Sequence, residues 1–377
     1  MSACRECASR ALLLAALAGH IDRAVDRRVG DRARDILALG DEELALAVCP
    51  SEPAKVLRRV RSADRHAALA GDLEAAGCWS TCRHRAPLPD ALSASPAAPA
   101  ALFGKGDPAL LSGLVPERAA TVVGSRRAGA YGREIARELS RTLAASGIVV
   151  ISGLALGVDS AAHEGALAGP GTTVAVLGTG ADRPYPRSHR RLYERIHAGG
   201  LILSELPPCS PTFRWMFPAR NRLMAALAGV TVVVEAAERS GSLITAEMAI
   251  DAGRQVGAVP GPVNSWRSEG ANKLLADGAA VIRGAQDVLD LLLGPGAVQV
   301  GRRGPPLGER ELAALGAVEA GASTPDGVGA AAGLPFTRAL AALGRLERDG
   351  YLRADATGAL SRTALRAPEA GMGGGLG

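Results

Sequence analysis

The sequence predicts a doubly wound α/β fold of Rossmann-like type with a mostly parallel sheet, placed between a small N-terminal helical domain and a C-terminal winged helix. Between Ala119 and about Leu293, short apolar runs alternate with helical patterns. Runs that are apolar throughout are typical of parallel strands covered by helices on both faces. The strands expected on this basis are residues 120–123, 148–151, 173–177, 201–203, 230–234, 255–259 and 279–282.

Changes in composition divide the chain around this central part. A Pro-, Ala- and Ser-rich stretch precedes it and a Gly- and Pro-rich stretch follows it, as is typical of boundaries. We expect a helical domain at 1–80, a linker and lead-in segment at 81–118, the Rossmann-like domain at 119–294, a linker at 295–306, the winged helix at 307–365 and a flexible tail at 366–377.

The N-terminus allows two interpretations. Arg5 and Arg10 precede the apolar stretch Ala11–Ala18, which resembles a short signal peptide. The same stretch also fits an amphipathic helix that continues to Val25 and Val29. We favour the helix, because Glu6 interrupts the basic region that a signal peptide requires.

Six cysteines in so long a chain do not suggest a disulfide framework, so a cytoplasmic location is the simpler hypothesis. Cys4 and Cys7 form a CxxC pair, and Cys78, Cys82 and His84 form a looser cluster, so together they offer a zinc site. Only one pair has zinc-like spacing, and cysteine is also a common small apolar residue. We therefore expect no metal site.

Charge and hydropathy limit the partners. The chain has 377 residues, with 43 Lys and Arg against 38 Asp and Glu, for a net charge of +5. This excess permits a polyanionic partner without requiring one. No segment is apolar over the length that a membrane span needs, so we expect no membrane partner.

The loop after the first expected strand carries Gly124, Ser125 and Arg126 at a helix start. Backbone N–H groups and the helix dipole suit a phosphate there. The loop lacks both the nucleotide P-loop ending and the GxGxxG spacing, and the second strand ends in Ser152-Gly153 without an acidic residue. We therefore expect no nucleotide cofactor.

Two further loops at the same sheet edge suggest anion binding. Residues 214–222 combine arginines with Phe217, and an aromatic ring offers a stacking face for any base. Phe217 is alternatively a core residue, and Arg220 and Arg222 are alternatively paired with carboxylates such as Glu205 or Glu235. Residues 235–242 form the other loop, a small-residue turn at a helix N-terminus with a cation beside two hydroxyls. The candidate binding residues in these two loops are Arg214, Phe217, Arg220, Asn221, Arg239, Ser240, Gly241 and Ser242.

An enzyme is the competing hypothesis for the central domain. Asp159 and His163 lie four residues apart, on one face of a helix, where they would suit acid–base work or a metal. We favour a structural role, with Asp159 capping the helix that follows Gly157 and His163 packed inside. We therefore expect no catalytic residues, with a nucleoside monophosphate hydrolase as the alternative.

The C-terminal residues predict three short helices and a hairpin, which is the winged-helix arrangement. Thr324 and Pro325 form an N-cap and first helical position. One face of the third helix is expected to carry Leu340, Leu343 and Leu346. Its cations, which either reach DNA or form a solvated face, are Arg338, Arg345 and Arg348.

The order of motifs across residues 100–290 closely resembles the DprA (Smf) family of DNA-processing proteins. The matching stretches are 124–126, 152–163, 185–186, 204–205, 217–222, 240–246 and 259–261. His189 departs from the asparagine usual after the Tyr-Pro pair, and Ala128-Gly129 departs from the usual small-hydroxyl pattern.

The resemblance implies a cytoplasmic homodimer that binds and protects single-stranded DNA and loads RecA recombinase onto it during natural transformation. It implies an N-terminal helical domain of SAM-like type. It also implies that the DNA pocket uses Arg126, Arg214 and Arg239, with Arg187 as a weaker addition.

Overall fold

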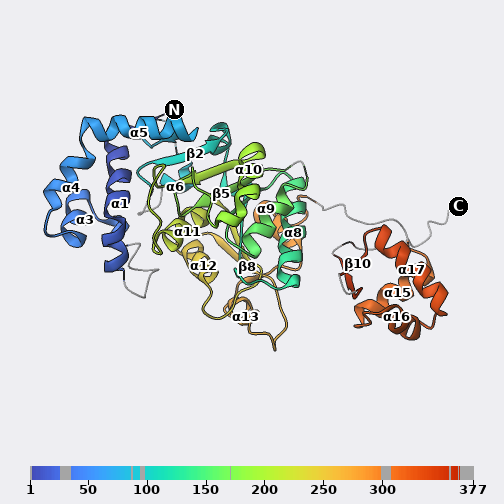
Figure 1. Ribbon diagram of the computed structural model, residues 1–377. Coiled ribbons are helices and arrows are strands. Elements are labelled where there is room, and N and C mark those ends of the chain that lie inside the picture. The colour runs from blue at the N-terminus through green and yellow to red at the C-terminus, as the bar shows by residue number, and fades with distance from the viewer. Residues whose placement is uncertain are drawn as a thin grey trace. The chain divides into compact units, whose positions relative to one another are not determined.

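The computed structural model describes residues 2–25, 35–85, 88–93, 98–169, 171–298, 307–355, 358–363 and 365. The chain divides into two compact units, Met1–Val298 and Gln299–Gly377 (Figure 1). The expected tail 366–377, and residues 299–306 of the expected second linker, lie outside the described residues.

A single mostly parallel sheet organises the first unit, so the predicted fold class is confirmed. Its strand order is β1-β2-β6-β5-β4-β3-β7-β8-β9. Strands β6 through β9 in this order pair in parallel, whereas β1 and β2 add an antiparallel edge. The strands are β1 Trp79–Thr81, β2 Leu102–Gly106, β3 Ala119–Val123, β4 Val149–Ser152, β5 Thr173–Leu177, β6 Leu201–Ser204, β7 Val230–Val233, β8 Gln255–Ala258 and β9 Ala280–Val281.

All seven predicted strands are present, and the two missed ones are the antiparallel edge. Strand β2 lies in the interval expected to be a linker and lead-in segment, where Phe103 pairs with Ser204 of β6. Its signal is weak because Gly104 and Gly106 interrupt the apolar run. Strand β1 has only three residues.

Helices cover both faces of the sheet, as a doubly wound fold requires. One face packs against α8 (Ala130–Ala145), α9 (Val158–Ala166), α10 (Arg190–Gly199) and α14 (Ala285–Leu293), and the other against α11 (Met216–Leu227) and α12 (Gly241–Asp251) (Figure 1). The chain reverses its direction of progress across the sheet between β3 and β7, and ligands bind beyond the carboxyl ends of strands at such a point.

The N-terminal helices belong to the first unit and share a core with the sheet. They are α1 (Arg5–Ala24), α3 (Asp41–Val48), α4 (Pro53–Val60) and α5 (Ala63–Ala76). The stretch Ala11–Ala18 lies inside α1, and the Trp215 indole donates a hydrogen bond of 3.0 Å to the Ala18 carbonyl. This packing favours the helix over the signal peptide, although Val29 lies outside the described residues. Among the described helices, none has the length and apolar character to cross a membrane.

The second unit has the expected order of elements. Three helices, α15 (Glu309–Glu319), α16 (Pro325–Ala332) and α17 (Phe336–Arg348), precede a hairpin of β10 (Leu352–Ala354) and β11 (Leu360–Arg362). Thr324 caps α16 as predicted, because its hydroxyl accepts from the Gly327 N–H at 3.2 Å.

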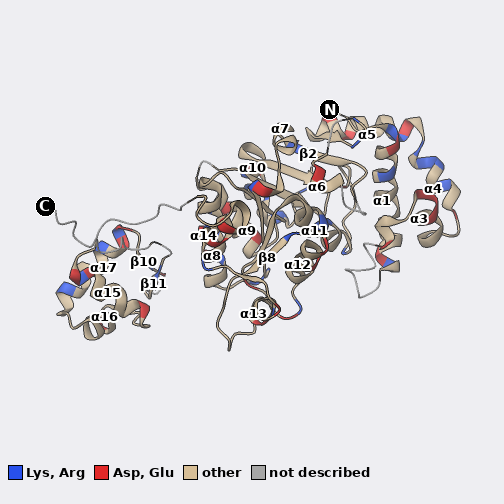
Figure 2. Ribbon diagram, turned by 180° about the vertical axis from the view of Figure 1, so that it is seen from behind, with Lys and Arg blue, Asp and Glu red and all other residues tan. Residues whose placement is uncertain are grey.

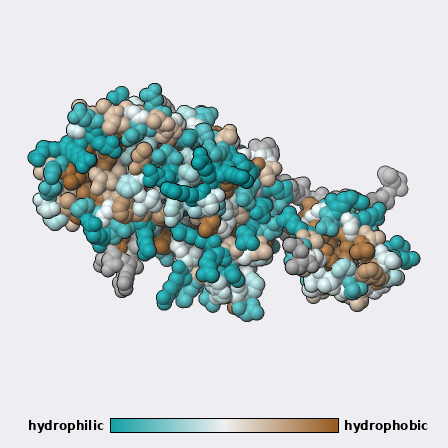
Figure 3. Space-filling model, viewed as in Figure 1, coloured by the Kyte–Doolittle hydropathy of each residue, from teal (hydrophilic) through white to brown (hydrophobic). Residues whose placement is uncertain are grey.

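The expected apolar face of α17 is wrong at one position. Leu343 and Leu346 are buried together with Ala339 and Ala342, but Leu340 is 50% exposed. The buried face of the helix runs through Ala339 and Ala342 instead. Figure 3 shows that this unit has apolar residues on its surface.

Candidate nucleic-acid interface

A cavity of about 390 Å³ opens where the chain reverses direction, at the carboxyl ends of β3 and β7. Three loops and the start of α11 line it. The predicted residues that line it are Gly124, Ser125, Arg126, Arg214, Phe217, Arg220, Asn221, Ser240, Gly241 and Ser242. The fold therefore brings together residues that are more than 100 positions apart in the sequence.

The Gly-Ser-Arg loop is fixed by backbone contacts on both sides. The Ser125 N–H donates to the Glu235 carbonyl at 2.6 Å, and the Ser125 carbonyl accepts from the Val158 N–H at 3.2 Å. Gly157 has φ +84°, and a Cβ there would lie 2.2 Å from the Ser125 oxygen. Glycine is therefore required where these two loops meet.

The side chain of Glu235 stabilises the end of this loop, a role that the sequence did not suggest. Its carboxylate is buried and accepts from the Gly129 N–H at 3.0 Å. A Cβ on Gly132 would lie 2.4 Å from the same carboxylate. Glu235 therefore fixes the start of α8, and it does not pair with Arg220 or Arg222 as the structural alternative allowed.

Three exposed arginines supply positive charge to the cavity. Arg126, Arg127 and Arg214 line it, and no ion pair or side-chain hydrogen bond occupies their guanidinium groups within the part of the chain that the structure describes. Elsewhere on the first unit, basic and acidic residues are interspersed over the helices (Figure 2). The cavity therefore gathers arginines that are not engaged in ion pairs, which suits it to phosphates.

Phe217 is half-buried at the cavity and lies between two other residues. Its ring centroid lies 4.9 Å from that of Tyr185, and the Arg126 guanidinium lies 5.7 Å from it. Tyr185 is 44% exposed, so the pair presents aromatic surface beside the cation. The other aromatic residue of this segment, Trp215, is buried in the core and offers no stacking face.

Arg220 is a predicted DNA-binding residue whose surroundings argue against direct contact with DNA. It is 6% exposed, and its guanidinium donates to the carbonyls of Gly153 and Val176. Burial lowers the pKa of Arg220 to about 10, although the attraction of Asp159 opposes this. These contacts favour the structural alternative for Arg220, which also lines the cavity, and a direct contact with DNA stays a prediction.

Arg222 also has a structural partner. It donates to the Glu205 carboxylate at 2.6 Å, and both side chains are largely buried. This pair is one of the two that the sequence had offered as the structural alternative. Asn221, whose amide lies 3.5 Å from the Gly241 carbonyl, remains at the cavity wall.

Ser240 and Ser242 form the start of α12 at the third loop. The Ser240 hydroxyl accepts weakly from the Ser242 N–H at 3.4 Å, and the two hydroxyl oxygens lie 2.8 Å apart. Gly241 is exposed and has nothing within 4 Å of its Cβ position, so a ligand can approach this helix N-terminus closely.

Two predicted cations lie outside the cavity lining. Arg239 is exposed and adjoins Ser240, which lines the cavity, so it stands at the rim. Arg187 is exposed in the short helix Arg187–His189 that follows Tyr185 and Pro186. Their roles in DNA binding stay predictions. Arg127, which follows Arg126 in the sequence, also lines the cavity, although we had not named it as a candidate DNA-binding residue.

The pair proposed for the enzyme alternative is committed to internal contacts. Asp159 is 4% exposed and accepts from the Gly153 N–H at 3.1 Å and the Ala155 N–H at 3.4 Å. It therefore braces the preceding loop, and the cap that we expected for its helix is wrong. Burial raises the pKa of Asp159, whereas Arg220 and the two backbone donors act in the opposite direction.

His163 is fully buried, and its Nδ1 lies 2.8 Å from the Thr173 hydroxyl. That hydroxyl donates to the Val150 carbonyl, so His163 is the donor in its own bond. Burial lowers the pKa of His163 to about 3, which keeps the imidazole neutral. Its packed, structural role is thus as expected.

Comparisons with known proteins match the central part of the chain. The family model described as DNA recombination-mediator protein A matches residues 80–293. A DNA processing protein DprA of Mycobacterium tuberculosis is 46% identical over 194 residues, which cover 52% of this chain and 49% of that protein. The chain thus spans about half the length of this relative.

Two solved structures are also similar. The X-ray structure of DNA processing protein A from Streptococcus pneumoniae has a TM-score of 0.59 and 33% identity, covering 77% of this chain and 98% of that one. DNA processing protein A from Helicobacter pylori, whose structure is described for its single-stranded DNA binding mode, has a TM-score of 0.50 and 33% identity, covering 55% of this chain and 93% of that one.

Proposed function

The chain belongs to the DNA recombination-mediator protein A family, and from that premise we propose that it binds single-stranded DNA at the cavity beyond β3 and β7. The observation that carries the proposal is the set of three exposed lining arginines, Arg126, Arg127 and Arg214, next to the aromatic surface of Phe217 and Tyr185. Arginines bind phosphates and a ring stacks on any base, so such a site binds single strands without reading sequence.

We expect a preference for single strands because their bases are free to stack on the aromatic rings of the site. In duplex DNA the bases are already stacked on one another, so only the phosphate contacts remain available to this site. Fluorescence anisotropy with an oligothymidine and a duplex of equal length, over a range of salt concentrations, tests the proposal. We expect tighter binding of the single strand throughout, and equal affinity for the duplex would overturn it.

We further propose that the protein acts as a cytoplasmic homodimer that protects the bound strand and loads RecA onto it in recombination and natural transformation. The family resemblance supports this role. In addition, contacts to phosphates and base faces release a strand stepwise to a competitor, and two sites in a dimer raise avidity. Sedimentation equilibrium tests the dimer. Filament assembly on strands covered by a single-strand-binding protein tests the loading, and a monomer without effect on assembly would contradict both.

The second unit has a weaker argument for DNA contact. Arg345 pairs with Glu311 at 3.1 Å and Arg348 with Asp349 at 3.2 Å, which favours a solvated face for these two cations. Arg338 is exposed on the same helix. The winged-helix assignment and its contact with duplex DNA therefore stay predictions.

The enzyme alternative receives no specific support, because Asp159 and His163 are held by the Gly153–Ala155 loop and Thr173. Incubation with nucleoside monophosphates tests it directly. Sustained release of free base would favour the hydrolase, whereas our proposal expects stoichiometric DNA binding without product.

A further inference from the structure

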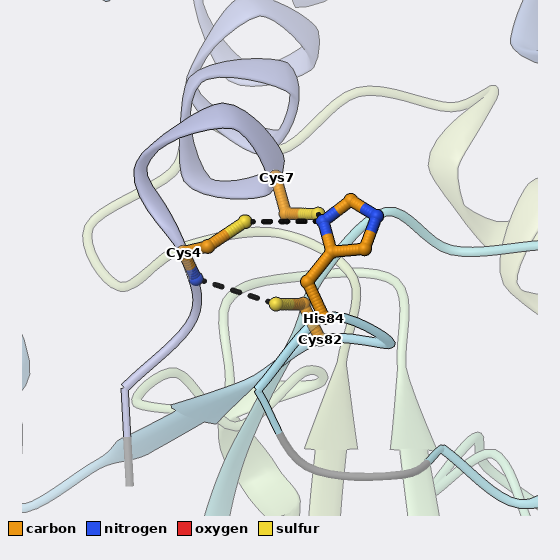
Figure 4. A group of neighbouring side chains, drawn as sticks. All are labelled: Cys4, Cys7, Cys82 and His84. Carbon is orange, nitrogen blue, oxygen red and sulfur yellow. Dashed lines mark hydrogen bonds between the residues drawn. The ribbon is translucent and has the colours of Figure 1, made fainter.

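Three cysteines and one histidine meet beside the edge strand β1, at the end of the sheet that is farther from β3 and β7. The helix α1 begins at the same place. Cys4 precedes α1 and Cys7 lies in its first turn, whereas Cys82 and His84 follow strand β1 (Figure 4). One ligand atom from each residue lies within 4.8 Å of all the others. No other group of three or more potential ligands meets this description among the residues that the structure describes.

We propose that Cys4, Cys7, Cys82 and His84 bind one zinc ion as a closed structural site. Three thiolates and one imidazole form a donor set typical of tetrahedral structural zinc. With Zn–S bonds of about 2.3 Å, the sulfur atoms of a tetrahedral site lie about 3.8 Å apart. The observed separations therefore require only small adjustments of side chains to accept the ion.

The histidine is oriented for this role. Its Nδ1 lies 3.3 Å from the Cys4 sulfur and 3.5 Å from the Cys7 sulfur, so the same nitrogen faces both. A simple hydrogen bond would need only one of these two sulfur atoms as the partner of the nitrogen. Because Nδ1 faces both sulfur atoms, it points toward the centre of the four-residue group. That centre is the position of the metal in a tetrahedral site.

Two hydrogen bonds from backbone N–H groups at the N-terminus hold it against strand β1 and the turn that follows. The Cys4 N–H donates to the Cys82 sulfur at 3.3 Å, and the Ala3 N–H donates to the Ser80 hydroxyl at 3.0 Å. An N–H donated to a ligating sulfur is the kind of outer contact that orients metal ligands. The dipole at the start of α1 also favours negative charge on Cys4 and Cys7.

The burial of the group explains why the site would be structural. Cys82 is fully buried and Cys7 is 4% exposed, whereas His84 lies at the surface and gives the ion a path of entry. Four protein ligands leave no coordination position for a substrate. The ion would fasten the start of α1 to the sheet edge, linking segments whose ligands are up to 80 positions apart.

We expected no metal because only one pair of cysteines has zinc-like spacing in the sequence. The fold overcomes this objection, since it brings the four residues together. Only the CxxC pair had zinc-like spacing in the sequence, whereas the turn after β1 supplies Cys82 and His84 as the second pair. Cys78, which the sequence had grouped with them, is not part of the group. This inference does not depend on the proposed DNA binding.

Elemental analysis of the full chain, purified under reducing conditions, tests the site first. We expect about one zinc ion per chain, and cobalt substitution should give the intense visible absorption of a tetrahedral thiolate site. If neither the purified nor the zinc-reconstituted protein retains the metal, or cobalt gives an octahedral spectrum, the proposal is overturned. A disulfide among Cys4, Cys7 and Cys82 that persists in the protein purified under reducing conditions would also overturn it.

Variants then assign the ligands. Cys82→Ser and His84→Ala should lose the bound zinc, and His84→Cys should regain it, because a fourth thiolate replaces the imidazole. Cys78→Ser is the matched control and should keep the wild-type zinc content. Unchanged zinc content in Cys82→Ser would contradict the assignment, and the cobalt spectrum of the wild-type chain remains decisive if a variant does not fold.

Discussion

Arg126 and Arg220 line the same cavity, yet their surroundings give them different tasks. Arg220 is buried and donates to the carbonyls of Gly153 and Val176. Arg126 is exposed, lies over the Phe217 ring, and has no hydrogen bond or ion pair within the described ranges. The comparison teaches that an arginine beside a binding cavity becomes part of the framework when backbone carbonyls surround it, and remains available to a ligand when they do not.

Removing the buried cation should have the largest effect. In Arg220→Met, the Gly153 and Val176 carbonyls and the Asp159 carboxylate lose their cationic neighbour inside the protein. We expect the free energy of unfolding to fall by about 3–5 kcal/mol, measured by urea denaturation. Unchanged stability with lost DNA affinity would reverse the roles assigned to the two arginines.

Arg126→Ala should produce the opposite pattern. Loss of a charge-assisted phosphate contact weakens DNA binding by about 1.5–3 kcal/mol, or roughly 10- to 150-fold, while stability changes by less than about 0.5 kcal/mol. Arg118→Ala is the matched control, because Arg118 is exposed just before β3 and Arg126 follows the same strand. Equal losses of affinity in both variants would mean that the effect is only one of net charge.

The stability of the first unit should respond to acid through the buried His163. Because the pKa of His163 is lowered to about 3, the unfolded chain binds a proton between about pH 6.5 and pH 3 that the folded chain does not. The free energy of unfolding therefore falls as the pH falls through this window, by up to about 1.4 kcal/mol per pH unit. Urea denaturation at several pH values should show that His163→Gln lacks this part of the slope.

The control for this measurement is His197→Gln, which makes the same substitution at a partly exposed histidine of α10. If His163→Gln and the wild-type chain lose stability in parallel on acidification, the buried imidazole is not held neutral, and the packed role of His163 would be contradicted.

The smallest effect is expected at the rim. Arg239 is exposed and does not line the cavity, so Arg239→Ala should weaken DNA binding by less than about 1 kcal/mol, or about fivefold. The anisotropy assay used for Arg126→Ala measures this directly. A loss as large as that of Arg126→Ala would show that the DNA path extends beyond the cavity toward α12.

The difference between Arg126 and Arg220 also marks what could be predicted from the sequence. The seven parallel strands were predictable because each is a continuous apolar run, and the loops at their carboxyl ends follow from the parallel topology. The structural role of Arg220 could not be predicted, because it depends on the carbonyls of Gly153 and Val176, which are 67 and 44 positions away in the sequence.

Other misses have the same physical origin. Asp159 was expected to cap its own helix, but the bend of the preceding loop brings the Gly153 and Ala155 N–H groups within its reach. The spacing of Cys4 and Cys82 gave no sign that the N-terminus would lie against strand β1. Local patterns predict elements, whereas the partners of a polar side chain are set by segments that only the folded chain brings together.

The salt dependence of binding to an oligothymidine tests the central claim most directly, because each arginine that contacts a phosphate contributes about 0.7 to the slope of log affinity against log salt. We predict that Arg126→Ala and Arg214→Ala each reduce the slope by about this amount, that the double variant reduces it by about 1.4, and that Arg118→Ala leaves it unchanged. A wild-type slope in the double variant would show that the cavity arginines do not bind the strand.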